Sequence, residues 1–388
     1  MSEGPAGRPN FVIIMSDQHN ARIMGCAGDP VVRTPNLDRL ARSGVRFTGA
    51  YCAAPLCNPS RTAFLTSLVP SDTGVWTNAG VLSPHVPTFL HALALAGYET
   101  VLCGRMHLRP DQDAGFERYL VGEVGSGKRP AGGLFEGKIP PETVGQKYLT
   151  MSAVGPGRSA YIAYDDDVTR RAVEFITART ARAPERPLCL IVGLLLPHCP
   201  YICPKELFEE YMDRVTLPEV PPGYEKGLHP ALRRWRATRG VEKITPEQAR
   251  KARAAYCGLV TYMDARIGEV LGALDAAGMS ENTVVAYLSD HGEMAGEHGM
   301  WWKDSFYEGA CGVPMIWRIP GRAQLEPPAG APAGSEVHSV VSLVDVGPTL
   351  LDLAGAGPLP HVRGRSLRPF LESGEAPSGW PDEAFAET

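Results

Sequence analysis

The segment PLCNPSRTAFLTSLVP, residues 55–70, places a cysteine at the start of an expected helix. Asn58 can cap such a helix, Pro59 suits its first turn, and apolar residues follow at helical spacing. The free N–H groups and the positive dipole end of a helix N-terminus favour an anion, and Arg61 adds a full positive charge one turn further on. Cys57 is therefore either reactive or the precursor of a reactive group, although a buried structural thiol is the commoner role of a cysteine.

Polar residues also follow four apolar runs that have the length and composition of buried strands. The runs are residues 11–15, 99–103, 188–196 and 283–288, followed respectively by Asp17 and Gln18, by Arg105 and His107, by His198, and by Asp290 and His291. The carboxyl ends of parallel strands form the ligand crevice of an open sheet, so these side chains could converge on one site. A single polar cluster after a strand is ordinary turn chemistry, but four of them favour a shared site.

One use of such a site is to bind a metal ion. The candidate ligands are two carboxylates, an amide oxygen and an imidazole, from Asp17, Asp290, Gln18 and His291. Oxygen ligands with one nitrogen suit a hard divalent cation such as calcium, magnesium or manganese better than zinc. The residue types constrain the metal without identifying it.

Another use is to bind an oxyanion. Cationic and proton-donating side chains near the same strand ends are Arg61, Arg105, Lys303, His107 and His198. Such groups can surround a doubly charged oxyanion, for example sulfate or phosphate. An isolated histidine beside an apolar run is more often a satisfied core residue, but the matching positions of the two histidines favour a role in the site.

The elements that must position these residues alternate between apolar runs and amphipathic helices. Helical spacing of apolar residues covers residues 87–97, 165–181 and 246–278. This alternation predicts an α/β fold with a mostly parallel central sheet sandwiched by helices. Residues 326–334 are rich in Pro, Gly and Ala and predict a surface loop. Residues 122–129 fit the start of a phosphate-binding loop, but Arg129 occupies the position of the metal-binding Ser or Thr, and we expect a plain loop.

Composition limits the partners and the compartment. The 388 residues carry 43 acidic and 38 basic side chains, a net charge of -5, so we expect neither nucleic acid nor a membrane surface as a partner. Nine scattered cysteines argue against a disulfide framework and for a reducing compartment. The N-terminal sequence has no apolar signal segment, and no apolar run is long enough to cross a bilayer. We expect a cytoplasmic protein that acts on a small molecule, and a homo-oligomer is compatible with the sequence.

The motifs together resemble one known family. The stretch CNPSR resembles the C-x-P-S-R signature of the type I sulfatases, the formylglycine-dependent branch of the alkaline phosphatase superfamily. Similar blocks follow in order across most of the chain, namely NFVIIMSDQ, TPNLDRLARSGVRFTGAYCAAPLC, GRMHL, PHCPY, LSDHGEMAGEHGMWWKDSFYE and VPMIWRIPG. The Asp-Gln and Asp-His pairs, GRMHLRPDQDAGFERY and the NAG around Asn78 look most like choline sulfatases and phosphonate monoester hydrolases.

The resemblance implies an answer to the question of the cysteine. Cys57 would be oxidised to formylglycine by a formylglycine-generating enzyme. A hydrated aldehyde offers one hydroxyl to attack sulfur and a second whose deprotonation expels sulfate, whereas a thiol or a serine would leave a stable adduct. The family further implies one divalent metal ion, with calcium as first choice and manganese or magnesium as alternatives, held by Asp17, Gln18, Cys57, Asp290 and His291.

The remaining roles are also implied by the resemblance. Arg61 would support the diol, while Arg105 and Lys303 would clamp the sulfate. His107 would help to deprotonate the spare hydroxyl, and His198 with Lys303 would contact or protonate the leaving oxygen.

Two departures from the family pattern affect this transfer. The family usually has lysine where this chain has Arg105, which keeps the charge but changes its geometry. The chain also ends at GWPDEAFAET, where sulfatases continue into a smaller C-terminal subdomain. We therefore expect a catalytic domain over residues 1–370 and a stub of a truncated C-terminal subdomain over residues 371–388.

The substrate is left open by the sequence. Trp76, Asn78 and Trp302 flank the expected site, and an aromatic face could hold a quaternary ammonium such as that of choline sulfate, although each tryptophan could equally be a core residue. Hydrolysis of sulfate esters is the favoured function. One alternative is hydrolysis of phosphonate monoesters or phosphodiesters at the same site, and another is an inactive, sulfatase-like binding protein with an unmodified Cys57.

Overall fold

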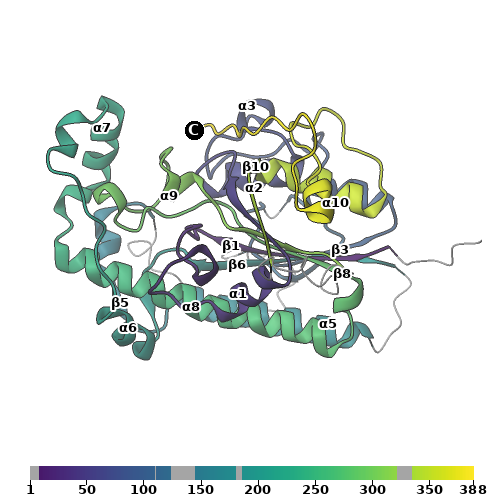
Figure 1. Ribbon diagram of the computed structural model, residues 1–388, viewed down its shortest axis with the longest axis horizontal. Helices are drawn as coiled ribbons and strands as arrows, with labels where there is room; N and C mark the ends of the chain where they lie inside the picture. Colours follow the sequence, from purple (N-terminus) through teal and green to yellow (C-terminus); the bar gives the residue numbers. More distant parts are fainter. Residues whose placement is uncertain (1–7, 110, 124–144, 181–185, 321–333) are drawn as a thin grey trace, which may run out of the picture.

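A computed structural model describes residues 8–109, 111–123, 145–180, 186–320 and 334–388 (Figure 1). Its centre is an eight-stranded sheet in the order β10-β2-β9-β8-β1-β6-β3-β4. The strands are β1 (Asn10–Asp17), β2 (Val45–Tyr51), β3 (Glu99–Gly104), β4 (Arg118–Val121), β6 (Leu188–Pro197), β8 (Thr283–Ser289), β9 (Met315–Arg318) and β10 (Ser335–Ser342). Only β9 runs antiparallel to its neighbours. The predicted α/β fold with a mostly parallel sheet is confirmed.

Helices cover both faces of the sheet. They are α1 (Pro35–Arg42), α2 (Cys57–Thr66), α3 (Pro70–Thr73), α4 (Phe89–Leu95), α5 (Ala160–Thr180), α6 (Lys205–Met212), α7 (Pro230–Arg239), α8 (Pro246–Ala276), α9 (Glu308–Cys311), α10 (Val346–Ala354) and α11 (Arg368–Ser373). In Figure 1, α1, α5 and α8 lie below the sheet, and α2 and α10 lie above it. A separate pair of short parallel strands, β5 (Gly155–Pro156) and β7 (Ile202–Cys203), lies apart from the main sheet.

Alternation along β1 explains the two layers. Val12 and Ile14 pack into the apolar core shared with α1, α5 and α8, whereas Phe11, Ile13 and Met15 pack into the core shared with α2, α4, α10 and α11. Successive side chains of a strand point to opposite faces. A strand covered on both faces is therefore apolar throughout until it ends, and this is why its polar C-terminal residues stand out in the sequence.

The helix boundaries differ from the sequence prediction at three starts. Helix α4 begins at Phe89 rather than at residue 87. Helix α5 begins at Ala160 rather than at residue 165, because the Ser159 hydroxyl accepts a hydrogen bond from the Ile162 N–H and caps the helix earlier. Helix α2 begins at Cys57, with Leu56 in the N-cap position, so the prediction of Asn58 as N-cap was wrong. The Asn58 amide instead donates to the carbonyls of residues 77 and 80.

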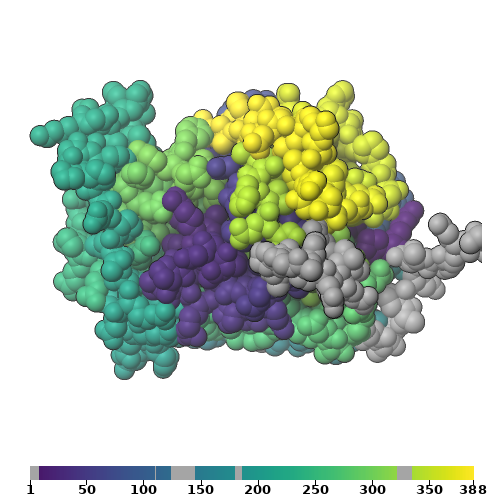
Figure 2. All heavy atoms as spheres, in the orientation of Figure 1, coloured from purple at the N-terminus to yellow at the C-terminus, as the bar shows by residue number. Residues whose placement is uncertain are grey.

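The C-terminal residues lie back against the domain. The Trp380 ring packs edge-on against Phe370 at 4.9 Å, and its indole N–H donates to the Val340 carbonyl at 2.9 Å. The Glu387 N–H donates to the Ala53 carbonyl at 2.9 Å. Figure 2 shows the yellow C-terminal residues in contact with the yellow-green residues before them. The division into residues 1–370 and a stub of residues 371–388 stays a prediction.

Two loop predictions cannot be compared with the structure. Nearly all of residues 122–129 and 326–334 lie outside the described residues.

Within the part of the chain that is described, no helix is both long and apolar enough to cross a membrane.

Candidate active site

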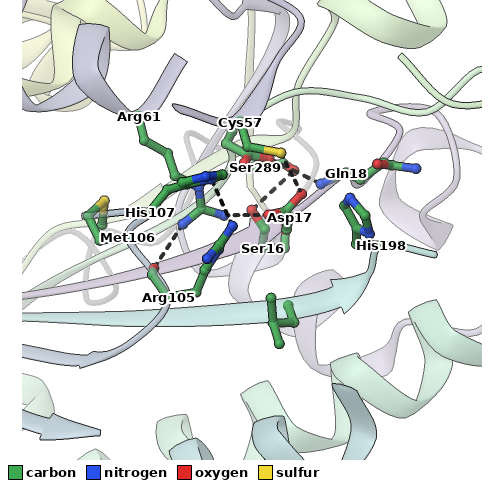
Figure 3. A network of polar contacts seen from close by, with 12 residues as sticks. Ser16, Asp17, Gln18, Cys57, Arg61, Arg105, Met106, His107, His198 and Ser289 are labelled. Carbon is green, nitrogen blue, oxygen red and sulfur yellow. Dashed lines mark hydrogen bonds and ion pairs between the residues drawn. The ribbon is translucent and has the colours of Figure 1, made fainter. Parts of the chain in front are cut away.

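The ends of four neighbouring parallel strands meet at one edge of the sheet. Strands β8, β1, β6 and β3 are adjacent in that order and run in the same direction. Asp17 ends β1, Asp290 follows β8, Arg105 follows β3, and His198 follows β6. Helix α2 brings Cys57 to the same edge from the opposite side (Figure 3). The topology thus joins residues that are far apart in the sequence.

Four buried side chains form a compact cluster of potential metal ligands. The ligand atoms of Asp17, Cys57, Asp290 and His291 all lie within 4.8 Å of one another. Cys57 Sγ is 3.3 Å from His291 Nε2, which is 3.5 Å from the Oδ1 atom of each aspartate. Burial lowers the pKa of His291 to about 4, and its Nδ1 donates to the Gly292 carbonyl. The neutral imidazole therefore presents the lone pair of Nε2 to the cluster, as a metal-binding histidine does.

Gln18 lies beside this cluster in the left-handed backbone region, with φ of 72°. Its backbone N–H donates to Asp290 Oδ1 at 3.1 Å, and its side-chain N–H group donates to the Glu293 carboxylate. Its buried Oε1 has no hydrogen-bond partner among the described residues. An unpaired buried oxygen, two carboxylates and a neutral imidazole fit a hard divalent cation.

Arg61 ties the two carboxylates together from the other side. Its Nε donates to Asp290 Oδ2 at 2.8 Å, its Nη2 donates to Asp17 Oδ2 at 3.1 Å, and its Nη1 donates to the Arg105 carbonyl at 2.8 Å. Each aspartate thus directs Oδ2 to the guanidinium and Oδ1 towards His291. Arg61 is 1% exposed, so these bonds form in a site from which water is excluded.

Lys303 brings a second buried cation to residue 57. Its Nζ lies 3.0 Å from Cys57 Sγ and 3.8 Å from Asp17 Oδ1. Burial alone would lower the pKa of this ammonium, but Cys57, Asp17 and Asp290 raise it above its usual value. Lys303 is therefore charged at neutral pH, directly beside the candidate nucleophile.

Arg105 and His107 are held by an acid that the sequence reasoning missed. The carboxylate of Glu123 accepts from Arg105 Nη1 at 3.0 Å and, through its other oxygen, from the backbone N–H groups of Met106 and Leu108. Arg105 Nη2 in turn donates to His107 Nδ1 at 2.7 Å. Glu123 follows the short strand β4, and no spacing rule connects it to the other site residues.

The state of His107 bears on its expected role as a base. Burial, with Arg105 next in effect, lowers the pKa of His107 to about 2, so the ring is neutral. A guanidinium can only donate, so Nδ1 accepts and the single ring proton is on Nε2. In this arrangement His107 can donate only through Nε2, and it can accept a proton only after the Arg105 contact opens.

His198 lies at the end of β6, which is fixed by a buried acid of α5. Asp165 accepts hydrogen bonds from the N–H groups of Leu195 and Leu196 at 2.8 and 2.9 Å. His198 Nδ1 donates to the Cys199 carbonyl at 2.5 Å, which leaves Nε2 free to exchange a proton. Sequence reasoning found His198 but not Asp165, because Asp165 reads as one of three ordinary helix acids in DDD.

Glu293 is the third acid that the sequence reasoning missed. It is fully buried, and its two oxygens accept from Gln18 Nε2, from the Tyr201 hydroxyl at 2.8 Å, and from the N–H groups of Ala295 and Trp302 at 2.9 and 2.6 Å. This carboxylate connects the end of β1 with the loop that carries Lys303. The only feature of the sequence that could have indicated a role for Glu293 in the site is its position three residues after Asp290.

A cavity of about 380 Å³ opens beside the site. Its walls are Asn78, Gly145, Gln146, Lys147, His198, Thr238, Arg239 and Lys303. Of the three expected substrate residues, the structure brings Asn78 to this cavity but not the two tryptophans. Trp302 is fully buried, and Trp76 is 43% exposed but does not line the wall.

Comparison with known proteins shows the family to which the chain is related. Residues 9–356 match the family model described as Sulfatase. The choline-sulfatase of Rhizobium meliloti (strain 1021) is 33% identical over 389 residues, which cover 95% of this chain and 72% of that protein. The arylsulfatase of Clostridium perfringens (strain 13 / Type A) is 30% identical over 405 residues, covering 98% and 81%.

Among solved structures, the phosphonate monoester hydrolase of Agrobacterium radiobacter superposes with a TM-score of 0.77 at 26% identity. This superposition covers 96% of this chain and 79% of that one. The family model matches most of the chain, and the relatives found by sequence and by structure all hydrolyse sulfate or phosphonate esters according to their names. The chain therefore belongs to the sulfatase family, within the fold of the alkaline phosphatase superfamily.

Proposed function

We propose that this protein hydrolyses sulfate esters, with residue 57 as the nucleophile after its oxidation to formylglycine. The observation that carries the proposal is the position of Cys57 Sγ, which lies 3.3 Å from His291 Nε2 and 3.0 Å from Lys303 Nζ. A nucleophile in that position adjoins both the candidate metal ligands and a charged ammonium. Chain membership in the sulfatase family supports the same reaction.

Two groups besides the encoded side chains belong to this proposal. A hydrated formylglycine would supply a hydroxyl nucleophile and a second hydroxyl whose deprotonation allows sulfate to leave. A divalent cation, when bound, would withdraw electrons from the oxygens that it contacts. Its ligands would be Asp17, Gln18, residue 57, Asp290 and His291, and calcium is our first choice because most of these atoms are oxygens, with manganese or magnesium as alternatives.

The cationic side chains would bind and orient the sulfate group. Lys303 can donate to a sulfate oxygen or to the leaving oxygen, because its ammonium is charged and adjoins residue 57. His198 lines the same cavity as Lys303, and in its imidazolium form it would donate the Nε2 proton to the leaving alcohol. Arg61 keeps Asp17 and Asp290 in place through their Oδ2 atoms.

Arg105 and His107 would act one after the other, first Arg105 in binding sulfate and then His107 as a base. When Arg105 turns its Nη2 group to a sulfate oxygen, it releases His107 Nδ1, to which it now donates at 2.7 Å. The neutral imidazole can then accept a proton from the spare hydroxyl at that nitrogen. Binding of sulfate would thereby prepare the base that is needed for its own release.

The first test is mass spectrometry of the tryptic peptide FTGAYCAAPLCNPSR, residues 47–61, after co-expression with a formylglycine-generating enzyme. We expect an aldehyde, or its hydrate, at residue 57 and an unchanged thiol at Cys52, which serves as the control within the same peptide. The protein should then release sulfate from phenyl sulfate, and Cys57→Ala should not. A plain thiol at residue 57 together with no sulfate release would overturn the proposal in favour of an inactive binding protein.

Hydrolysis of phosphonate monoesters is the second candidate. It is favoured by the superposition on a phosphonate monoester hydrolase at 26% identity and by the similar clamps that sulfur and phosphorus oxyanions require. The ratio of kcat/KM for phenyl sulfate to that for a phenyl phosphonate ester separates the two functions. A ratio above one supports the sulfatase.

We also propose a cytoplasmic location, because all nine cysteines are free thiols. The maturation enzyme would then be the main protein partner. Size-exclusion chromatography with light scattering would test for a homo-oligomer.

A further inference from the structure

We propose that the cavity beside Lys303 selects sulfate esters whose alcohol part carries a second anionic group. This inference rests on the proposed sulfatase function and specifies its substrate class. Three cationic residues line the cavity, namely Lys147, Arg239 and Lys303, and none of the described residues in its wall is a carboxylic acid.

The position of the cavity assigns it to the alcohol part of the ester. Lys303 forms part of its wall and also lies 3.0 Å from Cys57 Sγ, and His198 lines it as well. A sulfate group attacked by residue 57 is therefore bonded to an alcohol that leaves next to this wall. Lys147 and Arg239 lie on the same wall as Lys303, where they can contact substituents of that alcohol.

Arg239 is held ready for an anion. Its guanidinium lies over the Trp235 ring at 4.4 Å, donates through Nε to Gln146 at 3.3 Å, and pairs through Nη2 with Asp304. Its Nη1 has no hydrogen-bond acceptor among the described residues. A guanidinium fixed on three sides loses little conformational freedom when it binds one more oxygen.

Lys147 adds a charge that no neighbouring acid neutralises. Its side chain is exposed, and no carboxylate pairs with it in the described parts of the chain. Asp304 offsets Arg239 in part, and Asp17 and Asp290 offset Lys303, so Lys147 leaves the wall with an excess positive charge. This excess favours an anion such as a carboxylate or a second sulfate.

The same wall is unsuited to a quaternary ammonium. Its described residues include no Phe, Tyr or Trp ring, and Trp302, which could have offered one, is fully buried. Lys147 and Arg239 would also repel a cationic alcohol such as choline. The cavity thus separates this chain from a preference that its choline-sulfatase relative would suggest.

Matched aryl sulfates test the inference on the matured protein. The set is 3-carboxyphenyl sulfate, its methyl ester, 1,3-phenylene disulfate and 3-(trimethylammonio)phenyl sulfate. We expect kcat/KM for the carboxylate to exceed that for the methyl ester by about five- to tenfold, as two partly exposed ionic contacts allow, and the trimethylammonium compound to be the poorest substrate. The carboxylate and the disulfate together show which anion the cavity prefers.

Substitution of Lys147 assigns the preference to the cavity. Lys147→Gln should reduce the carboxylate-to-ester ratio severalfold. Lys205→Gln, on α6 and paired with Glu209, removes an exposed lysine outside the cavity and should leave that ratio unchanged. Equal ratios in the wild-type protein and Lys147→Gln would overturn the inference.

A binding experiment separates failure of the inference from failure of the proposed function. Calorimetry would compare 3-sulfobenzoate with benzenesulfonate, because neither sulfonate is hydrolysed. Turnover of phenyl sulfate without any preference for anionic substrates would overturn the inference alone. Absence of turnover with every sulfate ester would overturn the proposed function. In that case the calorimetry decides the inference. It stands if the wild-type protein binds 3-sulfobenzoate more tightly than benzenesulfonate and Lys147→Gln does not, and it falls otherwise.

Discussion

Replacing Arg61 by methionine should greatly reduce the stability of the metal-free protein. Methionine has a similar length and an apolar end, so the change removes the guanidinium without opening a large cavity. It leaves the Oδ2 atoms of Asp17 and Asp290 and the carbonyl of Arg105 without the donors that now lie at 2.8–3.1 Å. Two buried carboxylates would then lie close together without the cation that joins them.

The expected magnitude follows from the burial of the pair. Removing one partner of a buried ion pair costs about 3–5 kcal/mol, and an unpaired buried carbonyl costs about 1–3 kcal/mol. Lys303, at 3.8 Å from Asp17 Oδ1, would offset part of this loss. We therefore expect the free energy of unfolding to fall by about 4–5 kcal/mol. A divalent cation should recover part of it, because the Oδ1 atoms of the same carboxylates face the metal cluster.

Urea unfolding followed by tryptophan fluorescence measures this change, once with a chelator and once with excess calcium. Arg363→Met is the matched control, because Arg363 makes a two-bond contact to Asp72 at 2.7 and 2.8 Å on the surface. Loss of that exposed pair should hardly move the unfolding midpoint, because water solvates both partners.

Similar midpoints for Arg61→Met and Arg363→Met would refute the reasoning. That result would mean that Asp17 and Asp290 become neutral, or gain water, without measurable loss of stability. A large loss that calcium does not reduce would support the role of Arg61 but contradict the metal site.

Three further predictions concern neighbouring groups. Glu293→Gln should lower the free energy of unfolding by about 2–4 kcal/mol, because the glutamine side chain cannot accept from all four donors. It should also reduce kcat, because Glu293 anchors the residue before Lys303. A urea midpoint and a kcat equal to those of wild type would contradict this prediction. Arg105→Lys should lower kcat/KM for phenyl sulfate about tenfold, the equivalent of one charge-assisted hydrogen bond, and an unchanged value would show that the fork of donors is dispensable. Burial lowers the pKa of His19 from 6.5 to about 4. Between these two pH values the unfolded chain therefore binds a proton that the folded chain does not. The stability of the fold with neutral His19 consequently falls as the pH falls. The stability advantage of wild type over His19→Gln should therefore shrink by about 2 kcal/mol from pH 7 to pH 5 in urea titrations, and a constant difference would rule out this titration.

The strand ends were predictable from the sequence because topology and burial act together there. A strand covered on both faces is apolar until it leaves the core, so Asp17 and Asp290 mark the ends of β1 and β8. Parallel neighbours then place those ends side by side. The start of α8 was predictable for a local reason, since Thr245 and Gln248 form a reciprocal cap.

Other features depend on contacts that no local pattern encodes. Asn58 has the composition of an N-cap, yet its amide binds the carbonyls of residues 77 and 80, because the tertiary structure supplies better-placed acceptors. Trp302 adjoins the site in sequence and is nevertheless fully buried, since an aromatic residue packs equally well in a core. Lys147 and Arg239 line the same cavity because the segment before Tyr148 passes the end of α7, where Arg239 donates to Gln146.

The contacts of Arg105 explain why an arginine suits this position, which departs from the expected family pattern. The planar guanidinium, at a position where the resemblance led us to expect lysine, binds Glu123 through Nη1 and His107 through Nη2 at the same time. A single ammonium could not hold both groups in this geometry. Glu123 also fixes the backbone of Met106 and Leu108, so it orients the loop that carries both the clamp and the candidate base. The arginine and Glu123 therefore act as a unit, and replacing the arginine by the usual lysine would remove a restraint on His107 as well as change a contact to sulfate.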